Sequence, residues 1–163
     1  MRQNREKKVN ILLCGYYGCH NAGDDATLQA ICESVRGALP QAEIAALTGE
    51  PAETARLCGC AAAARFSPRA LFAALRRCDV LVFGGGSLLQ DVTSSRSLLY
   101  YLALLRLARF FGKKTMLFGS GIGPVHDPAN RRRVAAAVRR VDCVTLRDAG
   151  SLDTLRQMSA ARP

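Results

Sequence analysis

Short apolar runs alternate with segments of helical periodicity along the chain. The apolar runs are four to six residues long and predict strands at residues 9–14, 43–47, 61–66, 79–83, 115–118 and 143–146. Apolar positions at helical spacing predict helices at residues 25–39, 53–57, 67–77, 97–111, 130–140 and 151–158. Strands separated by helices at this spacing build βαβ units. We therefore expect an α/β fold with one parallel sheet flanked by helices.

Two helix-to-strand junctions share a pattern. Arg76-Arg77 and Arg139-Arg140 each close a predicted helix, and Asp79 or Asp142 then precedes the next strand. We interpret them as equivalent junctions rather than as a repeat of the solenoid kind. The helix predicted at 97–111 is apolar around most of its circumference, which indicates burial on more than one side.

Length and charge narrow the function classes. The chain has 163 residues and a formal charge of +10, with 49% hydrophobic residues. This length suits one domain with a sizeable core, and no apolar run reaches the roughly 18 residues of a membrane-spanning helix. The sequence has no zinc finger and no basic tail with interleaved aromatics, so we expect no nucleic-acid partner.

Five arginines fall on the predicted helix 130–140, namely Arg131, Arg132, Arg133, Arg139 and Arg140. They favour either contact with an anionic membrane or a solvated helix face.

The cysteines indicate a reducing environment. There are seven, an odd number, scattered along the chain without a Cys-x-x-Cys pair. This spacing argues against a structural zinc site and against a disulfide scaffold. Most lie inside apolar segments, where Cys acts as a small hydrophobic residue. We expect a cytoplasmic protein, peripheral to the inner face of the membrane if the arginines bind lipid.

Glycine-rich turns follow three of the predicted strands. They begin at Gly15, Gly84 and Gly119. Because ligands bind beyond the carboxyl ends of parallel strands, three such turns at one sheet edge favour a ligand site over tight turns alone. None of them has the G-x-G-x-x-G spacing of a dinucleotide site or the P-loop sequence, so nicotinamide and ATP are disfavoured.

Polar residues in these turns are candidates for chemistry. Asp24 and Asp25 stand at the start of a predicted helix. Each carboxylate could either cap the helix or take part in catalysis. Asn21 is well placed to bind a ligand hydroxyl. His20 and His126 lie in two of the loops and could act as acid or base, or be solvated bystanders.

Three arginines lie in loops or at strand ends rather than on helices. They are Arg65, Arg96 and Arg147. A guanidinium group clamps phosphate or carboxylate with two hydrogen bonds, which makes a phosphorylated carboxylate plausible as substrate. A surface ion pair is the alternative for each of them.

Together these segments resemble the polysaccharide pyruvyl transferase family, and in particular its CsaB-like branch. The residues that carry the resemblance span most of the chain: 15–18 with Asn21 and Gly23-Asp24-Asp25-Ala26, then 83–94, 96–102, 121–124 and 145–148. The resemblance implies transfer of pyruvate from phosphoenolpyruvate to a sugar of a cell-wall polysaccharide precursor, which forms a pyruvate ketal and releases phosphate. The implied acceptor is a lipid-linked amino-sugar disaccharide. Beyond phosphoenolpyruvate as donor, we expect no cofactor and no metal.

The resemblance also implies a domain organisation. Residues 1–163 would form a single Rossmann-like N-terminal domain, one half of a two-domain GT-B-like architecture whose C-terminal domain is absent here. Such a half-domain would be inactive alone, since a cleft enzyme needs both walls to position donor and acceptor.

The family motifs and the sheet edge together give the expected site. Catalytic roles are expected for Asp24, Asp25 and Arg147. Substrate contacts are expected from Asn21, Arg65, Gly84, Gly85, Gly86, Gln90, Asp91, Gly121 and Gly123. Two rival functions stay open: a GT-B-type glycosyltransferase with a nucleotide-sugar donor, and a non-catalytic half-domain that binds a glycan or partner.

Overall fold

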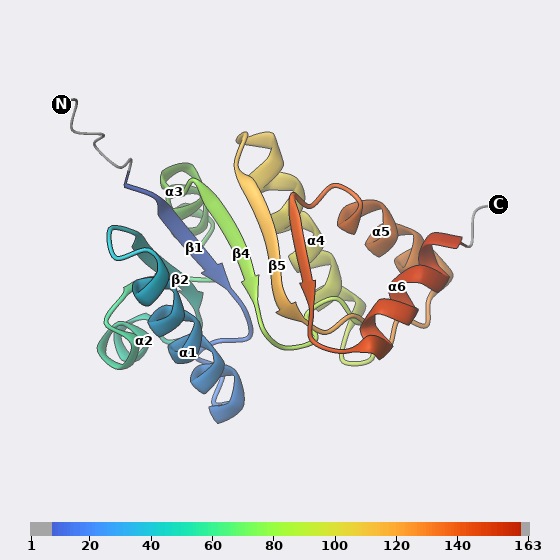
Figure 1. The fold of residues 1–163 in the computed structure, drawn as a ribbon, viewed down its shortest axis with the longest axis horizontal. Coiled ribbons are helices and arrows are strands. Elements are labelled where there is room, and N and C mark those ends of the chain that lie inside the picture. Colours follow the sequence, from blue (N-terminus) through green and yellow to red (C-terminus); the bar gives the residue numbers. More distant parts are fainter. Residues whose placement is uncertain (1–7, 161–163) are drawn as a thin grey trace.

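Six parallel strands form one sheet in the described part of the chain, residues 8–160 of the computed structural model (Figure 1). The strands are β1 (Asn10–Cys14), β2 (Glu43–Thr48), β3 (Ala61–Ala64), β4 (Val80–Gly84), β5 (Lys114–Ser120) and β6 (Cys143–Leu146). The helices are α1 (Ala22–Ala38), α2 (Pro51–Cys58), α3 (Pro68–Arg77), α4 (Ser95–Phe110), α5 (Pro128–Val138) and α6 (Ala149–Ala160). The predicted order of elements is confirmed.

The strand order is β3-β2-β1-β4-β5-β6, and it reverses between β1 and β4. Right-handed crossovers on the two sides of this reversal place helices on both faces of the sheet. Helices α1 and α2 cover one face, and α3, α4 and α5 cover the other (Figure 1). This is the doubly wound, Rossmann-like arrangement, which confirms the expected fold class.

The core consists of two apolar layers, one on each side of the sheet. Helix α4 dominates the larger layer: Leu98, Leu102 and Leu105 are buried there with Phe83 and Leu117 of the sheet. In the smaller layer, side chains of α1 pack on Leu13 and Val82. Each fully buried Leu contributes about 1.5–3 kcal/mol relative to an exposed one, so the apolar runs of the sequence hold the fold together.

Side-chain caps move three helix starts upstream of their predicted positions. Helix α1 begins at Ala22 rather than at residue 25 because the Asn21 side chain accepts the backbone N–H of Gly23 at 3.1 Å. Asp24 and Asp25 therefore lie inside its first turn. Helix α4 starts after Ser94, whose hydroxyl accepts the backbone N–H of Arg96.

Helix α5 also differs from its predicted span. Asp127 caps its start and Pro128 occupies the first turn, so the helix begins two residues before Asn130. It ends at Val138, and Arg139 and Arg140 lie beyond it. The expectation that five arginines share this helix is therefore wrong.

Strand β5 runs further than the apolar pattern predicted. It includes Gly119 and Ser120, although the glycine-rich sequence there predicts a turn. The pairing with β6 is irregular at this point, and Gly119 has a φ of +56°. A side chain would be strained in that conformation, which explains why glycine, a residue that does not predict a strand, stands here.

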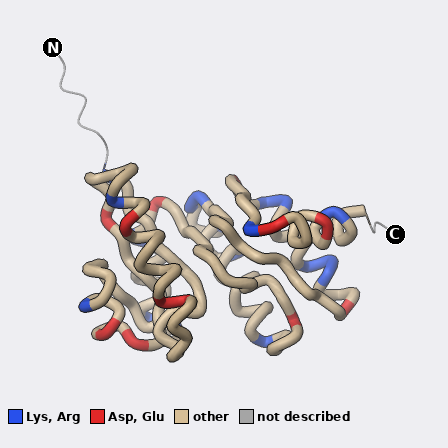
Figure 2. The backbone as a smooth tube through the Cα atoms, turned by 60° about the horizontal axis from the view of Figure 1, so that its bottom comes forward, with Lys and Arg blue, Asp and Glu red and all other residues tan. Residues whose placement is uncertain are grey.

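Positive charge is spread over several elements. Lys and Arg positions occur along most of the helices rather than on a single one (Figure 2). No helix in residues 8–160 is both long and apolar enough to cross a membrane.

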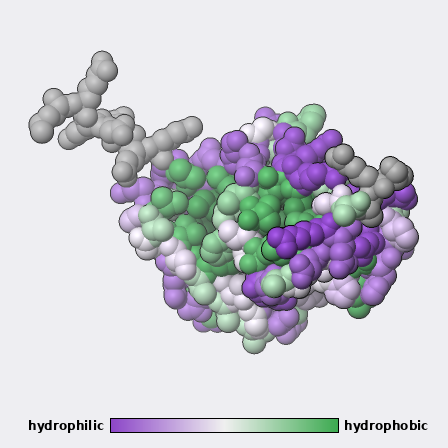
Figure 3. Space-filling model, turned by 45° about the vertical axis from the view of Figure 1, so that its right-hand side comes forward, coloured by the Kyte–Doolittle hydropathy of each residue, from purple (hydrophilic) through white to green (hydrophobic). Residues whose placement is uncertain are grey.

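Part of one sheet face lies beyond the helices that cover it. Met116 and Phe118 of β5 pair with Val82 and Gly84 of β4 and face the side of α1, yet the Phe118 side chain is 40% exposed. Hydrophobic surface with a hydrophilic border gathers on the face shown in Figure 3. The exposed apolar surface of β5 follows from the position of α1 and α2 over the other half of the sheet.

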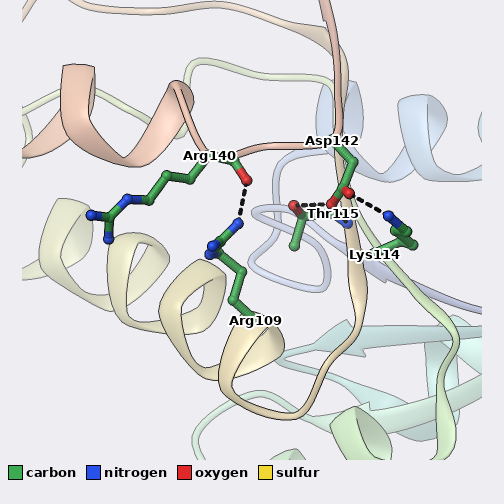
Figure 4. Close-up of polar contacts among 5 residues, drawn as sticks. All are labelled: Arg109, Lys114, Thr115, Arg140 and Asp142. Atoms are coloured by element: carbon green, nitrogen blue, oxygen red, sulfur yellow. Dashed lines mark hydrogen bonds and ion pairs between the residues drawn. The ribbon is translucent and has the colours of Figure 1, made fainter.

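The two junctions of shared sequence pattern are equivalent in the structure. The Asp142 carboxylate accepts the backbone N–H of Thr115, the second residue of β5, at 2.9 Å (Figure 4). The Asp79 carboxylate accepts the backbone N–H of Asn10, the first residue of β1, at 2.9 Å. In both cases an aspartate just before one strand fixes the start of the neighbouring strand.

Figure 4 also shows Arg109 donating to the carbonyl oxygen of Arg140, which ties α4 to the chain beyond α5.

The contacts of Asp142 predict a loss of stability in acid. Hydrogen bonds from the Lys114 ammonium and from Thr115 lower the pKa of Asp142 from 3.8 to about 2. Because the folded pKa is the lower one, this contribution is present above about pH 4 and is lost as the pH falls toward about 2. We expect the urea midpoint of Asp142→Asn to fall less over this pH range than that of the wild type.

Asp153→Asn is the matched control. Asp153 is an exposed aspartate on α6 whose partner, Arg156, lies at 3.6 Å. Its substitution should leave the pH profile of the urea midpoint close to that of the wild type. Identical profiles for Asp142→Asn and the wild type would contradict the assignment.

Candidate functional site

A cavity of about 310 Å³ opens at the carboxyl edge of the sheet, between the start of α1 and the turn after β4. It lies beside the point where the strand order reverses, the usual ligand position in such sheets. Its walls carry hydroxyl, amide and carboxylate groups. The lining residues are Tyr16, Asn21, Asp24, Gly86, Ser87, Leu88, Gln90, Thr93, Ser97 and Tyr101.

Larger cavities lie elsewhere, and two of them have a different character. One, of about 410 Å³, lies between α3 and the sheet and is lined largely by alanines such as Ala62 and Ala73. The other, of about 590 Å³, is a groove at α4 whose lining is apolar apart from Arg106 and Arg133. Binding sites combine an apolar enclosure with convergent polar groups, which favours the cavity at the carboxyl edge despite its smaller volume.

The start of α1 forms the acidic wall of this cavity. The Asn21 amide caps the helix and also donates to the Asp24 carboxylate at 2.6 Å. A Cβ atom at Gly86 would lie 3.2 Å from Asp24 Oδ1, so the carboxylate faces the turn after β4. Burial, and then the negative charge of Asp25, raise the pKa of Asp24 above its usual 3.8. The wall thus holds a carboxylate that binds protons more readily than a solvated one.

Asp25 has a different environment. Its carboxylate accepts the backbone N–H of Gly18 at 2.8 Å, which holds the loop between β1 and α1. Gly18 has a φ of +61°, and a Cβ atom there would lie 2.2 Å from Thr48 Oγ1. Asp25 does not line the cavity. The structure assigns it a role in loop geometry, and its catalytic role stays a prediction.

The three glycines after β4 differ in their surroundings. A Cβ atom at Gly84 would lie 2.5 Å from Ile31 Cδ1, and one at Gly85 would lie 2.4 Å from Thr27 Cγ2. Both positions therefore need glycine for close packing against α1. Of the three, Gly86 alone lines the cavity.

The turn after β5 lies against the turn after β4. The backbone N–H of Gly121 donates to the carbonyl oxygen of Gly86 at 2.8 Å. A Cβ atom at Gly121 would lie 2.3 Å from Ser87 Oγ and 3.0 Å from Arg147 Nη2. Glycine at 121 thus allows Ser87 and Arg147 to approach each other.

Arg147 reaches the rim of the cavity through Ser87. Its Nη2 donates to Ser87 Oγ at 3.4 Å, and its Nε pairs with Asp148 at 3.1 Å. The Arg147 side chain is 56% exposed. A guanidinium group in this position can still turn its donors toward an incoming anion.

Arg65 lies behind the aromatic wall of the cavity. It is only 4% exposed, and its guanidinium carbon lies 5.0–5.8 Å from the centroids of four rings, those of Tyr16, Phe66, Tyr100 and Tyr101. Its Nη2 donates to the Tyr101 hydroxyl at 2.9 Å, while its buried Nε has no hydrogen-bond partner. Among residues 8–160, no carboxylate forms an ion pair with it. A buried cation thus stands next to two lining residues, Tyr16 and Tyr101, instead of inside the cavity.

The remaining expected residues divide between the cavity and the adjacent turns. Gln90 lines the cavity and exchanges hydrogen bonds with Thr93. The Asp91 carboxylate accepts backbone N–H groups of His126 and Asp127 and the Asn130 amide, which anchors the segment before α5. Gly123 donates its backbone N–H to Leu89 and does not line the cavity. His20, His126 and Arg96 are exposed and stand outside the lining.

Six lining residues were not predicted as site residues, namely Tyr16, Ser87, Leu88, Thr93, Ser97 and Tyr101. Ser87 is the polar residue that ends the glycine run, a signal that could have been used. Tyr101 sits in the most apolar helix, where its sequence position indicates only core packing. Tyr16 and Ser97 lie in segments 15–18 and 96–102, which carry the resemblance, but their residue types do not single them out within those segments.

One comparison with known proteins gives a match. The family model described as polysaccharide pyruvyl transferase matches residues 21–160. No curated protein and no solved structure matches the chain. Within the part that the structure describes, no group of three or more His, Cys, Asp or Glu residues is placed to hold a metal ion.

The pair of aspartates at α1 predicts a measurable coupling. The charge of Asp25 contributes to the raised pKa of Asp24, so Asp25→Asn should lower the pKa of Asp24. Asparagine keeps an oxygen that can accept the Gly18 N–H, so the loop is retained. The pKa is measured by carbon NMR of the Asp24 carboxyl group during a pH titration. Asp127→Asn, at another helix start, is the control and should leave this pKa unchanged; an unchanged value in Asp25→Asn would refute the coupling.

Proposed function

The chain belongs to the polysaccharide pyruvyl transferase family, and from this premise we propose that it transfers pyruvate from phosphoenolpyruvate to a lipid-linked amino-sugar disaccharide. The family makes the protein a transferase that acts in pyruvyl transfer to a polysaccharide. The proposal adds the donor, the acceptor and the place of reaction, which is the cavity at the carboxyl edge. It is supported by one observation above all: an acidic wall at α1 and a rim with Arg147 border the same polar cavity.

The acceptor sugar binds at the acidic wall in this proposal. A pyruvate ketal joins two hydroxyl groups of one sugar, so both hydroxyls must be held and deprotonated. Asn21 and Asp24 offer an amide and a carboxylate for these hydroxyls. The raised pKa of Asp24 makes its carboxylate a better proton acceptor than a solvated aspartate.

The donor binds toward the turn after β4. Phosphoenolpyruvate carries a phosphate and a carboxylate, and guanidinium groups bind both with paired hydrogen bonds. Arg147 and the Ser87 hydroxyl supply donors at the rim. Arg65 adds positive potential from behind the Tyr16 and Tyr101 side chains, where burial weakens screening by water.

The reaction then needs three events. A proton is added to the methylene carbon of the donor as one sugar hydroxyl attacks the adjacent carbon and gives up its own proton, which balances the one consumed. The second hydroxyl then closes the ketal, the C–O bond to phosphate breaks, and the proton of this hydroxyl leaves with the phosphate. Asp24 accepts a hydroxyl proton, and Arg147 stabilises the negative charge on the departing phosphate. Tyr101 and Leu88 enclose the cavity and limit access of water, which would compete with the sugar.

A donor assay tests this function and the role of Arg147 together. Phosphate release from phosphoenolpyruvate is measured with an amino-sugar disaccharide acceptor in the full two-domain context that the resemblance implies, and donor binding is measured by calorimetry on the same protein. We expect Arg147→Gln to lower kcat/KM, and the affinity for phosphoenolpyruvate, by at least about tenfold, since a charge-assisted contact supplies roughly 1.5–3 kcal/mol.

Arg132→Gln is the control, because Arg132 is an exposed arginine on α5 away from the cavity. It should leave both quantities unchanged. Equal binding by Arg147→Gln and the wild type would reduce Arg147 to a surface ion pair with Asp148. Turnover with a nucleotide-sugar instead of phosphoenolpyruvate would favour a glycosyltransferase, and glycan binding without turnover of either donor would favour a binding half-domain.

Contact with an anionic membrane would bring the protein to a lipid-linked acceptor, and we propose it for the surface of α4 and α5. Arg132 and Arg133 of α5 are exposed, and Arg139 and Arg140 follow the helix. The neighbouring groove contains Phe110, which is 82% exposed, beside Arg106 and Leu99. Basic and apolar side chains on one surface are typical of peripheral membrane contact.

Vesicle co-sedimentation measures this contact. Each basic side chain near an anionic surface contributes about 1 kcal/mol, so the double variant Arg132→Gln and Arg139→Gln should bind anionic vesicles at low salt at least about tenfold more weakly. The matched control makes the same charge change on α3, with Arg69→Gln and Arg76→Gln, and should bind as the wild type does. Equal binding to neutral vesicles, or equal loss in both double variants, would refute the α4–α5 surface.

A further inference from the structure

An aromatic cluster surrounds the buried Arg65 side chain at the carboxyl edge of the sheet, beside the cavity described above. Its solvent-accessible members are Phe66, which is 77% exposed, Tyr16, which is 46% exposed, and the half-buried Tyr100. The guanidinium carbon of Arg65 lies 5.0–5.4 Å from the centroid of each of these rings. The rings of Tyr16, Phe66 and Tyr100 are called the aromatic platform below.

Three separate elements bring the platform together. Tyr16 lies two residues after the end of β1, Phe66 lies two residues after the end of β3, and Tyr100 lies on the second turn of α4. Parallel strands end at the same edge of a sheet, and α4 begins at that edge after the turn that follows β4. The rings therefore meet at the carboxyl edge although they are distant in sequence.

Arg65 holds the rings from the buried side. It is only 4% exposed, and its backbone carbonyl oxygen accepts the Tyr100 hydroxyl at 3.0 Å. The centroids of the Phe66 and Tyr100 rings lie 6.0 Å apart, and the ring planes are tilted by 52°. Because these contacts fix the rings in advance, a ligand that binds them loses little affinity to the ordering of side chains.

The exposure of the platform is not explained by packing within the chain. Phe66 and Tyr16 belong to neither apolar layer of the core. A single exposed apolar side chain is ordinary on a protein surface, whereas a group of them beside a cavity marks a binding surface. Contact with a ligand therefore explains these two rings better than core packing does.

The platform is continuous with the cavity. Tyr16 belongs to both, and the Tyr100 ring lies 5.3 Å from the ring of the lining residue Tyr101, measured between centroids. The cavity holds about 310 Å³, near the lower limit of the roughly 300–1,000 Å³ that is usual for ligand sites. A ligand built of several linked units would therefore fill the cavity with one unit and extend over the platform with the next.

We propose that the aromatic platform binds a sugar ring of the glycan acceptor, next to the sugar that occupies the cavity. The inference rests on the proposed function for the place of that first sugar. The family acts in pyruvyl transfer to a polysaccharide, in which neighbouring sugars are linked in a chain. A pyranose ring has a face of C–H groups, whose small positive partial charges pack on the negative face of an aromatic ring.

A sugar fits the platform better than an anionic lipid or a second copy of the chain. The Arg65 cation is buried beneath the rings, and the neighbouring cavity wall carries the Asp24 carboxylate, which would repel an anionic headgroup. Two copies would each bring a formal charge of +10 to a shared interface, which opposes their association. A neutral sugar meets neither obstacle.

Titration calorimetry on the 163-residue protein tests the platform. The probes are N-acetylglucosamine and its linear tetrasaccharide, two neutral amino-sugar ligands that differ in length. We expect Phe66→Ala to weaken binding of the tetrasaccharide about threefold to tenfold, the effect of losing one aromatic contact, and to leave binding of the monosaccharide unchanged. Because the ligands are neutral, both affinities should be the same at low and at high salt.

The outcome is separable from that of the proposed function. Phosphoenolpyruvate is absent from the titration, so pyruvyl transfer could fail while the platform still binds the sugar. Conversely, an unchanged tetrasaccharide affinity in Phe66→Ala would overturn the platform and leave the donor assay with Arg147→Gln unaffected.

Phe110→Ala is the matched control, because Phe110 is an exposed phenylalanine that ends α4, and it should bind both sugars as the wild type does. Phe66→Trp keeps an aromatic face and should retain the tetrasaccharide affinity, whereas Phe66→Leu should lose it. Circular dichroism checks that each variant is folded. A wild type that binds both sugars equally or binds neither, an equal loss in Phe110→Ala, or full affinity in Phe66→Leu overturns the proposal.

Discussion

The candidate site depends on a backbone contact beyond the ends of two parallel strands. After β4 and β5 end, Gly121 still donates to the carbonyl oxygen of Gly86, and Gly123 donates to that of Leu89. This contact continues the pairing of the sheet into its turns. It places Ser87 against Arg147 and Gly86 against Asp24, so both walls of the cavity follow from it. Any side chain at Gly121 would separate the turns.

The two charges of the site are held in different ways. Asp24 lies at the positive end of α1 and is half-buried, so the helix favours its charge while burial disfavours it. The Arg65 guanidinium is buried from water and makes cation–π contacts with four aromatic rings. Each well-placed contact of this kind stabilises the cation by about 0.5–2 kcal/mol. Its Nε hydrogen bond is missing, so the cation is incompletely neutralised. An acidic front wall and a cationic back wall make the cavity strongly polarised.

The sequence predicts this fold better than this site. Apolar runs and their spacing were sufficient for the number and order of the strands, because burial decides both the run and the strand. Helix starts shifted because caps such as Asn21 act through side-chain contacts that hydrophobicity does not register. At the site, Gly84 and Gly85 look like ligand positions but serve packing on Ile31 and Thr27. Arg65 and Tyr101 meet through tertiary contact across 36 positions of sequence, which no local pattern encodes.

The aspartates at the two equivalent junctions also act as markers of strand alignment. Asp79 accepts a hydrogen bond from the first residue of β1, and Asp142 accepts one from the second residue of β5. Each aspartate therefore fixes the register between its own strand and the neighbouring strand. Side chains alternate between the two faces of a sheet, and a slip by one position would exchange core and surface. During evolution, insertions upstream of either aspartate can therefore lengthen the connection harmlessly. Insertions between the aspartate and its strand would turn that strand over, and we expect selection to remove them.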